Sequence, residues 1–467
     1  MLKVQGFAGL TPLQEAVLIG SSEDVKNQLS KFHLQEDRNM LRQTALHLAV
    51  WRPQHLDLLL DGDLKIDLRD RNGRTPLMYA AAAGTTSVAL SLVKAGANLQ
   101  VKDTLYGNHD FLHYAVVSTH WDLAIEVLDF VRQSPMFSSD EVRSLLNTAI
   151  IYWARESSEQ RKSEHLDSLL IWGADPEVKL TVRWKWHLEE NNTLLHCISN
   201  LRDLDTLVTN GFKSFNHVNS SGAHPLMKLV EWNDPRLLQK CIESGSFINH
   251  RDYSGRTALH VSAEEIWEPS LYSILNGWDL CFESFKSAEE LLHRGAEPFL
   301  GDTCRCACSK AGCVPVNILL KEYRELWVNY KCLPRSQYFV VLEWLDLIRT
   351  VLGLEDAKQC LLDIIRVVRF EELELTHTCC RKLSSKWKGL WTTLDEDEVD
   401  ELLDEEKELI VDLESQMCQI EKDIHPGSNL DAIFFSEATK LIQIRTERQR
   451  SLFLASRTNF NANVSPN

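Results

Sequence analysis

Apolar and polar positions along the chain follow a pattern of short amphipathic helices that recurs about every 33 residues. The clearest segments are GRTPLMYAAAAG from Gly73 and GRTALHVSAEE from Gly255. Related segments begin at Gly9, Arg42, Asn192 and Gly222, and a weaker copy begins at Asp110. Inside two clusters, successive threonine-equivalent positions lie 31 or 33 residues apart. One such unit cannot bury both of its faces, so the period predicts a stack of helix pairs.

The local chemistry of each unit explains where its helices begin and end. Asp70–Gly73 is short and polar and suits a turn that needs a positive φ at the glycine. Thr75 can cap the next helix, and Pro76 occupies a first turn in which no backbone donor is lost. Gly96 is placed to end the second helix of the pair in the left-handed conformation.

The second half of the unit also recurs, as LVKAGANL from Leu92, LLIWGADP from Leu169 and LLHRGAEP from Leu291. Together the two halves resemble the ankyrin repeat, with its T-P-L-H-x-A signature and its 33-residue period. The resemblance implies an all-α solenoid of about eight units over residues 1–300, built from helix-turn-helix units with β-turn fingers. Residues 104–192 and 266–286 depart from the pattern, and we expect irregular structure there.

Ankyrin arrays bind protein partners through their fingers and through the concave face of their first helices. Carried over to this chain, the resemblance implies a partner-binding surface formed by Arg38, Trp51, Arg52, Arg69, Arg71, Asn72, Arg74, Lys102, Trp232, Arg251, Tyr253 and Arg256. Arginine forks match carboxylate and phosphate groups, so we expect a protein segment with acidic or phosphorylated residues. The alternative is that these arginines are solvated turn residues. Charge reversal of Arg71 and Arg74 should distinguish the two by weakening binding while the fold stays intact.

A cysteine-rich segment, GDTCRCACSKAGCVP, follows the last clear repeat. We expect residues 301–391 to form a helical module that holds a structural zinc ion, with ligands drawn from Cys304, Cys306, Cys308, Cys313, His377, Cys379 and Cys380. The alternatives are that the cysteines are core residues or form disulfides. The module resembles the tail of uncharacterised ankyrin proteins of filamentous fungi, a resemblance that implies no activity.

The remaining chain is strongly charged. The formal net charge is −17, of which the segment from Asp395 to Asp423 carries −12. Its apolar series, interrupted at Glu406, predicts a long acidic helix, and His425–Gly427 separates it from a second helix rich in arginine. We expect residues 392–456 to form an antiparallel hairpin of an acidic and a basic arm, and residues 457–467 to be a disordered tail.

The motifs present favour a binding protein over an enzyme. Phosphate-binding, dinucleotide-binding, zinc-protease and nucleophile-elbow motifs are absent from the sequence. We therefore predict an intracellular scaffold or adaptor, cytoplasmic or nuclear, with a protein partner and no membrane span. Two alternatives remain: a zinc-dependent enzyme with its site in residues 301–391, and a nuclear regulator that contacts nucleic acid. The acidic net charge argues against the last.

Overall fold

The computed structural model describes residues 9–31, 38–62, 64–104, 107–156, 161–184, 187–275, 285–320, 333–378, 396–425 and 427–462. The chain forms two compact units, and each is described by itself. The first consists of Met1–Val178 and Asp205–Phe212, and the second of Lys179–Leu204 and Lys213–Asn467. This division differs from the expected boundary at residue 300. One of its boundaries, between Leu204 and Asp205, falls within helix α11 (Leu201–Thr209).

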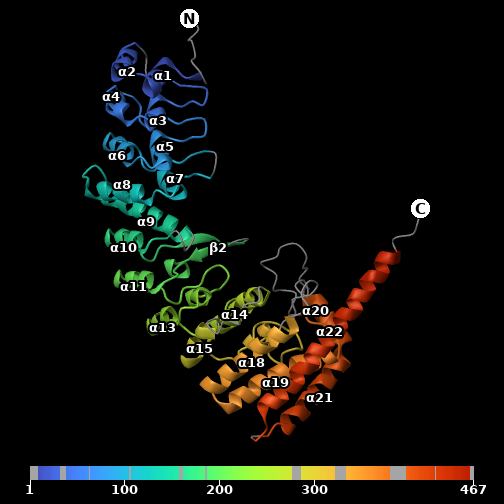
Figure 1. Cartoon of the computed structure of the whole chain (residues 1–467). Helices are drawn as coiled ribbons and strands as arrows, with labels where there is room; N and C mark the ends of the chain where they lie inside the picture. The colour runs from blue at the N-terminus through green and yellow to red at the C-terminus, as the bar shows by residue number, and fades with distance from the viewer. Residues whose placement is uncertain are drawn as a thin grey trace. The chain divides into compact units, whose positions relative to one another are not determined.

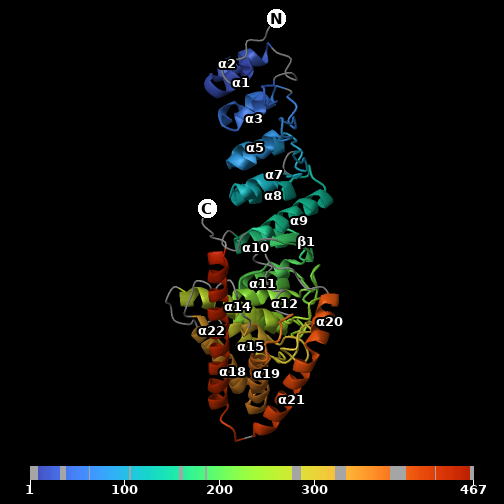
Figure 2. The same ribbon diagram turned by 90° about the vertical axis from the view of Figure 1, so that its right-hand side faces the viewer.

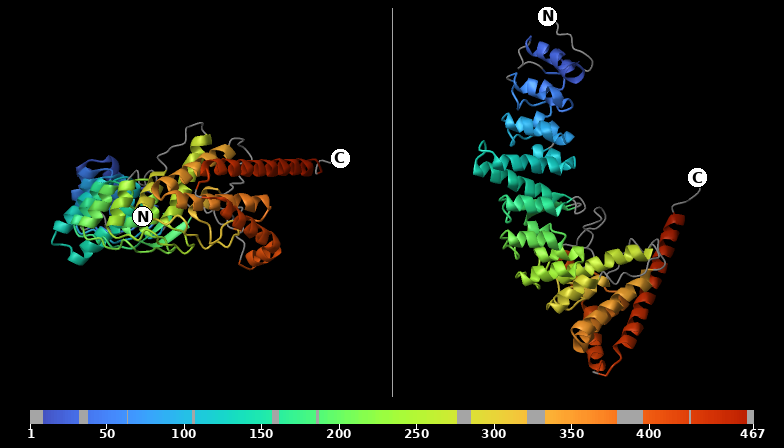
Figure 3. Two further views of the ribbon diagram at one scale, coloured as in Figure 1. Left: turned by 90° about the horizontal axis from the view of Figure 1, so that it is seen from below. Right: turned by 60° about the vertical axis from the view of Figure 1, so that its left-hand side comes forward.

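The first unit is a stack of helix pairs in two rows (Figure 1; Figure 3, right). Helices α1, α3, α5, α7 and α9 pack in series along one row, and α2, α4, α6 and α8 lie along the other. The elements are α1 (Pro12–Ile19), α2 (Ser22–Leu29), α3 (Ala45–Ala49), the 3-10 helix η3 (Pro53–His55), α4 (Leu56–Leu60), α5 (Pro76–Ala83), α6 (Thr86–Lys94), α7 (Phe111–Val117), α8 (Trp121–Gln133), α9 (Ser139–Arg155) and α10 (Ser163–Ile171). The finger loops leave the row that contains α1, α3, α5 and α7 (Figure 1).

Helix α5 shows why these residues form a helix of this length. The Thr75 hydroxyl accepts the backbone N–H of Met78 at 3.4 Å, and Pro76 fills the first position of the helix. Gly84 ends the helix in the left-handed conformation with φ 69°. Small residues such as Ala80 and Ala81 are fully buried, which lets neighbouring first helices approach closely.

The second unit begins with a β-hairpin that the all-α expectation did not include. Strands β1 (Leu180–Trp184) and β2 (His187–Asn192) pair antiparallel, with Val182 opposite Glu189. The reason lies in the alternation of the sequence: Leu180 and Val182 are buried, whereas Thr181 between them is only partly covered. The hairpin lies inside the stretch that the sequence marked as irregular.

The rest of the second unit is helical. Its further elements are η4 (Leu194–His196), α12 (Pro225–Leu229), η5 (Val230–Trp232), α13 (Pro235–Glu243), α14 (Ala258–Leu275), α15 (Lys286–His293), α16 (Pro315–Leu319), α18 (Leu333–Val351), α19 (Leu354–Glu372), α20 (Glu396–Glu405), α21 (Lys407–Asp423) and α22 (Leu430–Ala462). The expected irregularity over 266–286 is in part a continuation of α14, which runs on to Leu275. Within the described ranges, none of the helices is both long enough and apolar enough to cross a bilayer.

Helix α19 is the centre of the C-terminal part, and Figure 2 shows it between α21 and α22. The expected pairing of an acidic arm with a basic arm is therefore corrected: each arm pairs with α19. Arg366 of α19 binds Glu414 of α21, and Arg369 binds Glu437 of α22 at 2.8 Å. Arg445 of α22 binds the buried carboxylate of Glu371. Helix α19 thus supplies a cation to the acidic arm and both a cation and an anion to the basic arm.

Candidate functional site

The finger loops share one hydrogen-bond pattern, which fixes the shape of the surface they form. In the finger of α5, the Oδ1 atom of Asp70 accepts the backbone N–H groups of Asn72 and Arg74, at 2.8 and 2.9 Å. The backbone of Asp70 also pairs with the carbonyl of Arg74. The same pattern recurs at Asn39, Asn219 and Asp252. Each finger is therefore closed by one Asp or Asn side chain.

Adjacent fingers are joined to one another through their backbones. The N–H of Arg71 donates to the carbonyl of Leu41 at 2.8 Å, and the N–H of Thr104 donates to that of Asn72 at 3.1 Å. In the second unit, the N–H of Tyr253 donates to the carbonyl of Ser221 at 3.3 Å. The fingers thus form a continuous row within each unit, as a binding surface built from separate loops requires.

Buried histidines at the start of the first helices tie each repeat to the next. The Nδ1 atom of His47 accepts the N–H of Thr44 at 3.1 Å, so the proton is on Nε2, which donates to the carbonyl of Arg74 at 3.0 Å. His196 makes the equivalent pair of bonds to Thr193 and Ala223. Burial lowers the pKa of His47 to about 4 and that of His196 to about 3. These histidines, at the histidine position of the T-P-L-H motif, are neutral structural groups.

The predicted finger residues of the first unit divide into exposed and internally bonded groups. Arg69, Arg71 and Lys102 are exposed, as is Trp51, at 60%. Arg74 is bonded within its own finger: its guanidinium pairs with Asp70 at 2.9 Å and donates to the Tyr79 hydroxyl at 3.0 Å. The expectation that Arg74 could be reversed in charge without affecting the fold is therefore corrected.

Three further predicted residues of the first unit also make bonds inside the solenoid. Arg38 donates to the carbonyl of Arg69 at 3.2 Å, and Arg52 donates to that of Leu18 at 2.8 Å. The backbone N–H of Asn72 bonds to the finger carboxylate of Asp70. Arg52 stays exposed despite its bond, so the exposed members of the predicted set in the first unit are Trp51, Arg52, Arg69, Arg71 and Lys102.

The predicted residues of the second unit show the same division. Tyr253 is 73% exposed, whereas Trp232 is half-buried. Arg256 occupies the position of Arg74 in its finger and pairs in the same way with Asp252, at 3.0 Å. Arg251 donates to the carbonyls of Gly255 and Gly301, so it too holds finger loops in place.

The first unit has a pocket of about 790 Å³ between the finger that precedes α7, helix α7 itself and helix α9. Lys102 and His109 line it from the finger, His113 from α7, and Tyr152 and Arg155 from α9. The rings of His109 and His113 stack with their centroids 3.5 Å apart. Asp103 shapes this finger, because its carboxylate accepts the N–H of His109 at 3.2 Å and the Tyr114 hydroxyl at 2.6 Å.

Among the residues that line this pocket, cations outnumber carboxylates. Lys102 and Arg155 supply two exposed cations, while Glu156 at the edge is the acidic residue of the lining. Burial and the neighbouring His109 lower the pKa of His113 to about 4, so His113 contributes a neutral ring. Burial and the Asp110 carboxylate raise the pKa of Tyr152, which keeps its hydroxyl protonated. The pocket can therefore offer two cations and the neutral ring of His113 to a negatively charged side chain, whereas the Tyr152 hydroxyl is already hydrogen-bonded to Asp110.

Of these pocket residues, the sequence predicted only Lys102. His109, His113, Tyr152 and Arg155 lie in the stretch that departs from the repeat consensus. Their spacing along the chain gives no sign that α9 packs against α7. A usable signal was the longer finger itself, since Asp103 and His109 are six residues apart, compared with four in the finger of Asp70.

The cysteine-rich loop is a further finger of the same kind. The Oδ1 atom of Asp302 accepts the N–H groups of Cys304 and Cys313, at 2.9 and 2.8 Å, and its backbone pairs with the carbonyl of Cys313. The N–H of Thr303 donates to Ser254 of the preceding finger at 2.9 Å. His260 also donates to the carbonyl of Cys313, as His47 does to that of Arg74. The repeat pattern thus continues beyond residue 300 through a finger with an insertion.

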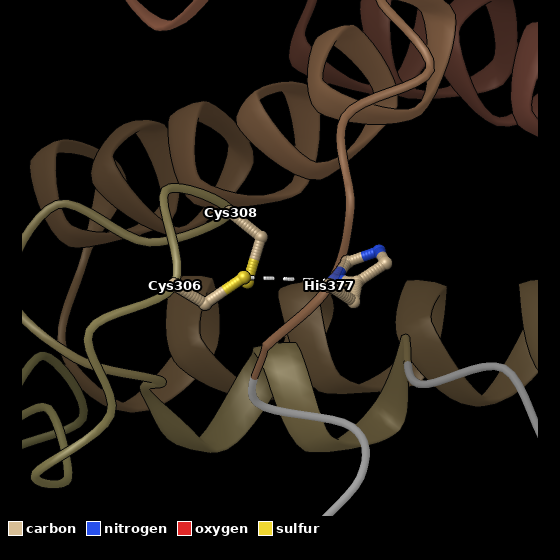
Figure 4. A group of neighbouring side chains, drawn as sticks. All are labelled: Cys306, Cys308 and His377. Atoms are coloured by element: carbon tan, nitrogen blue, oxygen red, sulfur yellow. Dashed lines mark hydrogen bonds between the residues drawn. The ribbon is translucent and has the colours of Figure 1, made fainter. Parts of the chain in front are cut away.

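The structure brings together some of the predicted metal ligands. Ligand atoms of Cys306, Cys308 and His377 lie within 4.8 Å of one another, and Figure 4 shows the two thiols facing the imidazole. Cys304 and Cys313 form a second group with Asp302. Cys379 and Cys380 lie outside the described residues.

Comparisons with known proteins agree with this fold. Residues 13–103 match the ankyrin-repeat family in three copies. The chain is 21% identical over 306 residues to an ankyrin repeat protein of Acanthamoeba polyphaga mimivirus, covering 59% of this chain and 39% of that protein. It is 24% identical over 337 residues to the E3 ubiquitin-protein ligase KEG of Arabidopsis thaliana, covering 54% of this chain and 20% of that protein.

A shorter match is to the IkB-like protein of African swine fever virus, at 42% identity over 74 residues, covering 16% of this chain and 30% of that protein. The chain therefore spans between a fifth and two fifths of the length of these relatives. The family match and the finger geometry agree on the central point: the chain contains ankyrin repeats.

Proposed function

We propose that this protein is an interaction scaffold or adaptor that holds an acidic or phosphorylated segment of a partner protein in the pocket beside α7 and α9. The ankyrin repeats are protein-interaction modules, which gives the general class of function. The observation that carries the specific proposal is the pair of exposed cations, Lys102 and Arg155, on one pocket of about 790 Å³.

The neighbouring fingers extend this surface. Arg71 is exposed one finger away, and its backbone belongs to the row that also holds Thr104. Trp51, two residues after the end of α3, adds an exposed aromatic side chain of the type that anchors protein interfaces. A bound segment would place its anionic residue in the pocket and continue along the finger row.

The experiment that tests the proposal is a peptide-display selection on the full-length protein with two matched libraries. The first library fixes an anion at a central position, glutamate in one arm and phosphoserine in a second arm. The other library fixes lysine at the same position. We expect enrichment only from the anionic library, with the phosphoserine arm showing which anion is preferred. Equal enrichment from the lysine library would contradict the proposal, since a pocket lined by Lys102 and Arg155 should repel a cation.

A further inference from the structure

Two clusters of metal-ligand types lie in and around the cysteine-rich finger, and the finger hydrogen-bond pattern accounts for only one of them. The cluster of Asp302, Cys304 and Cys313 is formed by the finger itself. The Asp302 carboxylate accepts the N–H groups of Cys304 and Cys313 just as Asp70 accepts those of Asn72 and Arg74. The Asp302 carboxylate therefore has the structural role that an Asp or Asn side chain has at the same position of every regular finger.

The cluster of Cys306, Cys308 and His377 has no counterpart in the other described fingers. Its two thiols belong to the insertion, which separates Asp302 and Cys313 by eleven residues where the finger of Asp70 needs four. Both thiols are 2% exposed. The imidazole comes from the segment after α19, and its Nδ1 atom lies 3.8 Å from the Sγ atom of Cys306 (Figure 4). Ligands from two distant segments thus converge on one point.

The orientation of His377 suits a metal ligand. While Nδ1 faces the thiols, Nε2 lies 3.8 Å from the carboxylate of Glu371. Glu371 is itself held by the guanidinium of Arg445, at 3.1 and 3.2 Å from Nε. A metal-bound histidine usually presents its second N–H to a carboxylate, which fixes the tautomer and the direction of the ring.

The backbone that carries His377 is also held in position. The N–H of Thr376 donates to both carboxylate oxygens of Glu406, at 3.0 and 3.1 Å. The ring of His377 packs on Phe370 with centroids 4.4 Å apart. Glu406 is the charged position that interrupts the apolar series of the acidic segment. Its structural role is to accept the Thr376 N–H and so hold the backbone next to His377.

We infer that Cys306, Cys308 and His377 bind a thiophilic divalent cation, zinc above all, which clamps the inserted finger to the end of α19. Two thiolates and an imidazole nitrogen match the ligand preference of zinc. Binding would displace the two thiol protons to solvent, leave the proton of His377 on Nε2 facing Glu371, and change no oxidation state. Cys304 and Cys313, which the sequence also suggested as ligands, lie in the separate group with Asp302. This inference does not rest on the proposed partner site.

The test is metal analysis of the full-length protein, purified without chelators, incubated with zinc and passed through gel filtration. We expect about one zinc per chain, and less than about a tenth of that in the Cys306→Ser, Cys308→Ser double variant. Cys418→Ser is the matched control, because Cys418 is exposed on α21, and it should keep the full content. Unmodified protein that retains no zinc, or a double variant that retains it, would overturn the inference.

A second measurement covers the case in which the double variant does not fold. Cobalt added to the unmodified protein should give the intense absorption of thiolate–cobalt bonds and of a tetrahedral site, and zinc should displace it. His377→Gln removes a proposed ligand, so it should weaken cobalt binding by more than the about tenfold that losing a supporting group costs. An intact mass lower by two hydrogens per chain, a peptide map that joins Cys306 to Cys308 and the absence of a cobalt spectrum would together show a Cys306–Cys308 disulfide and refute the metal site.

Discussion

The buried histidines each keep a proton on one defined nitrogen, because Nδ1 accepts a backbone N–H while Nε2 must donate to the next repeat. This geometry holds only for the neutral ring. The first repeat achieves it without a histidine: Gln14 accepts the N–H of Thr11 through Oε1 and donates through Nε2 to the carbonyl of Gln43 at 2.8 Å. Glutamine is therefore a substitute already present in this chain.

Stability should fall as the pH drops from 6.5 towards 4. His47 and His196 have pKa values of about 4 and 3 in the folded state, against about 6.5 when unfolded. At a pH between the folded and the unfolded pKa values, the unfolded state binds more protons, so acidification lowers the free energy of unfolding. Above pH 6.5 both states are unprotonated and this loss of stability is absent. At pH 5 we expect a loss of about 2 kcal/mol for each histidine. Urea unfolding followed by circular dichroism at pH 7.5 and 5.0 measures this.

The variant His47→Gln, His196→Gln is the control for that experiment. It should keep the hydrogen bonds, as Gln14 does, and lose much of the difference between the two pH values. A variant with the same pH dependence as the unmodified protein would show that other groups cause it.

The residue before the closing position of each finger adopts a positive φ, and in two fingers, at Arg42 and at Asn108, it is not glycine. Gly73, Gly222 and Gly255 have φ near 80°, whereas Arg42 occupies the same place with φ 61°. We predict that Arg42→Gly stabilises the protein by about 0.5–1 kcal/mol, since left-handed backbone is costly for a residue with a Cβ. The reverse change, Gly73→Arg, should destabilise it, because a Cβ there would lie 2.6 Å from Thr104. A lower urea midpoint for Arg42→Gly would contradict this account.

At the scale of the element, the finger of α5 separates structural from exposed arginines. Arg74 pairs with the buried carboxylate of Asp70 and donates to Tyr79, while the side chain of Arg71 is exposed. We expect Arg74→Gln to cost about 1–3 kcal/mol, as for hydrogen bonds to charged groups, and Arg71→Gln to stay within about 0.5 kcal/mol. Thermal unfolding of the two variants compares them directly, and equal losses would show that Arg74 does not organise the finger.

The repeat elements were predictable because their residues act locally. Thr75, Pro76 and Gly84 specify where α5 begins and ends, and no distant contact is needed to read them. The finger around Cys313 was not recognised as one, because the insertion breaks the spacing from Asp302 to the closing position. Likewise, the apolar series of the acidic segment predicted helices but could not indicate that Arg366 of α19 would be their partner.

At the scale of the whole molecule, the candidate site shows the same limit. Lys102 was predicted from its place on a finger, whereas Tyr152 and Arg155 reach the pocket only because α9 replaces a regular first helix. His377 was predicted as a ligand, but the sequence could not indicate that it lies beside Cys306 and Cys308. That proximity depends on the path of the chain after α19. Contacts between segments far apart in the sequence are not encoded in the local pattern of either segment.

The central claim is that the pocket beside α7 and α9 binds an anionic peptide segment through Lys102 and Arg155. The most direct measurement is the affinity of full-length protein for a peptide from the anionic selection, by fluorescence anisotropy. Lys102→Glu with Arg155→Glu should weaken binding by about tenfold or more, and the loss should shrink as added salt screens the charges.

The matched control is Lys65→Glu with Arg143→Glu, which makes the same change of net charge at exposed positions outside the pocket, Arg143 on α9 itself. We predict that it binds the peptide nearly as well as the unmodified protein. Equal affinities for the pocket variant and this control would contradict the account.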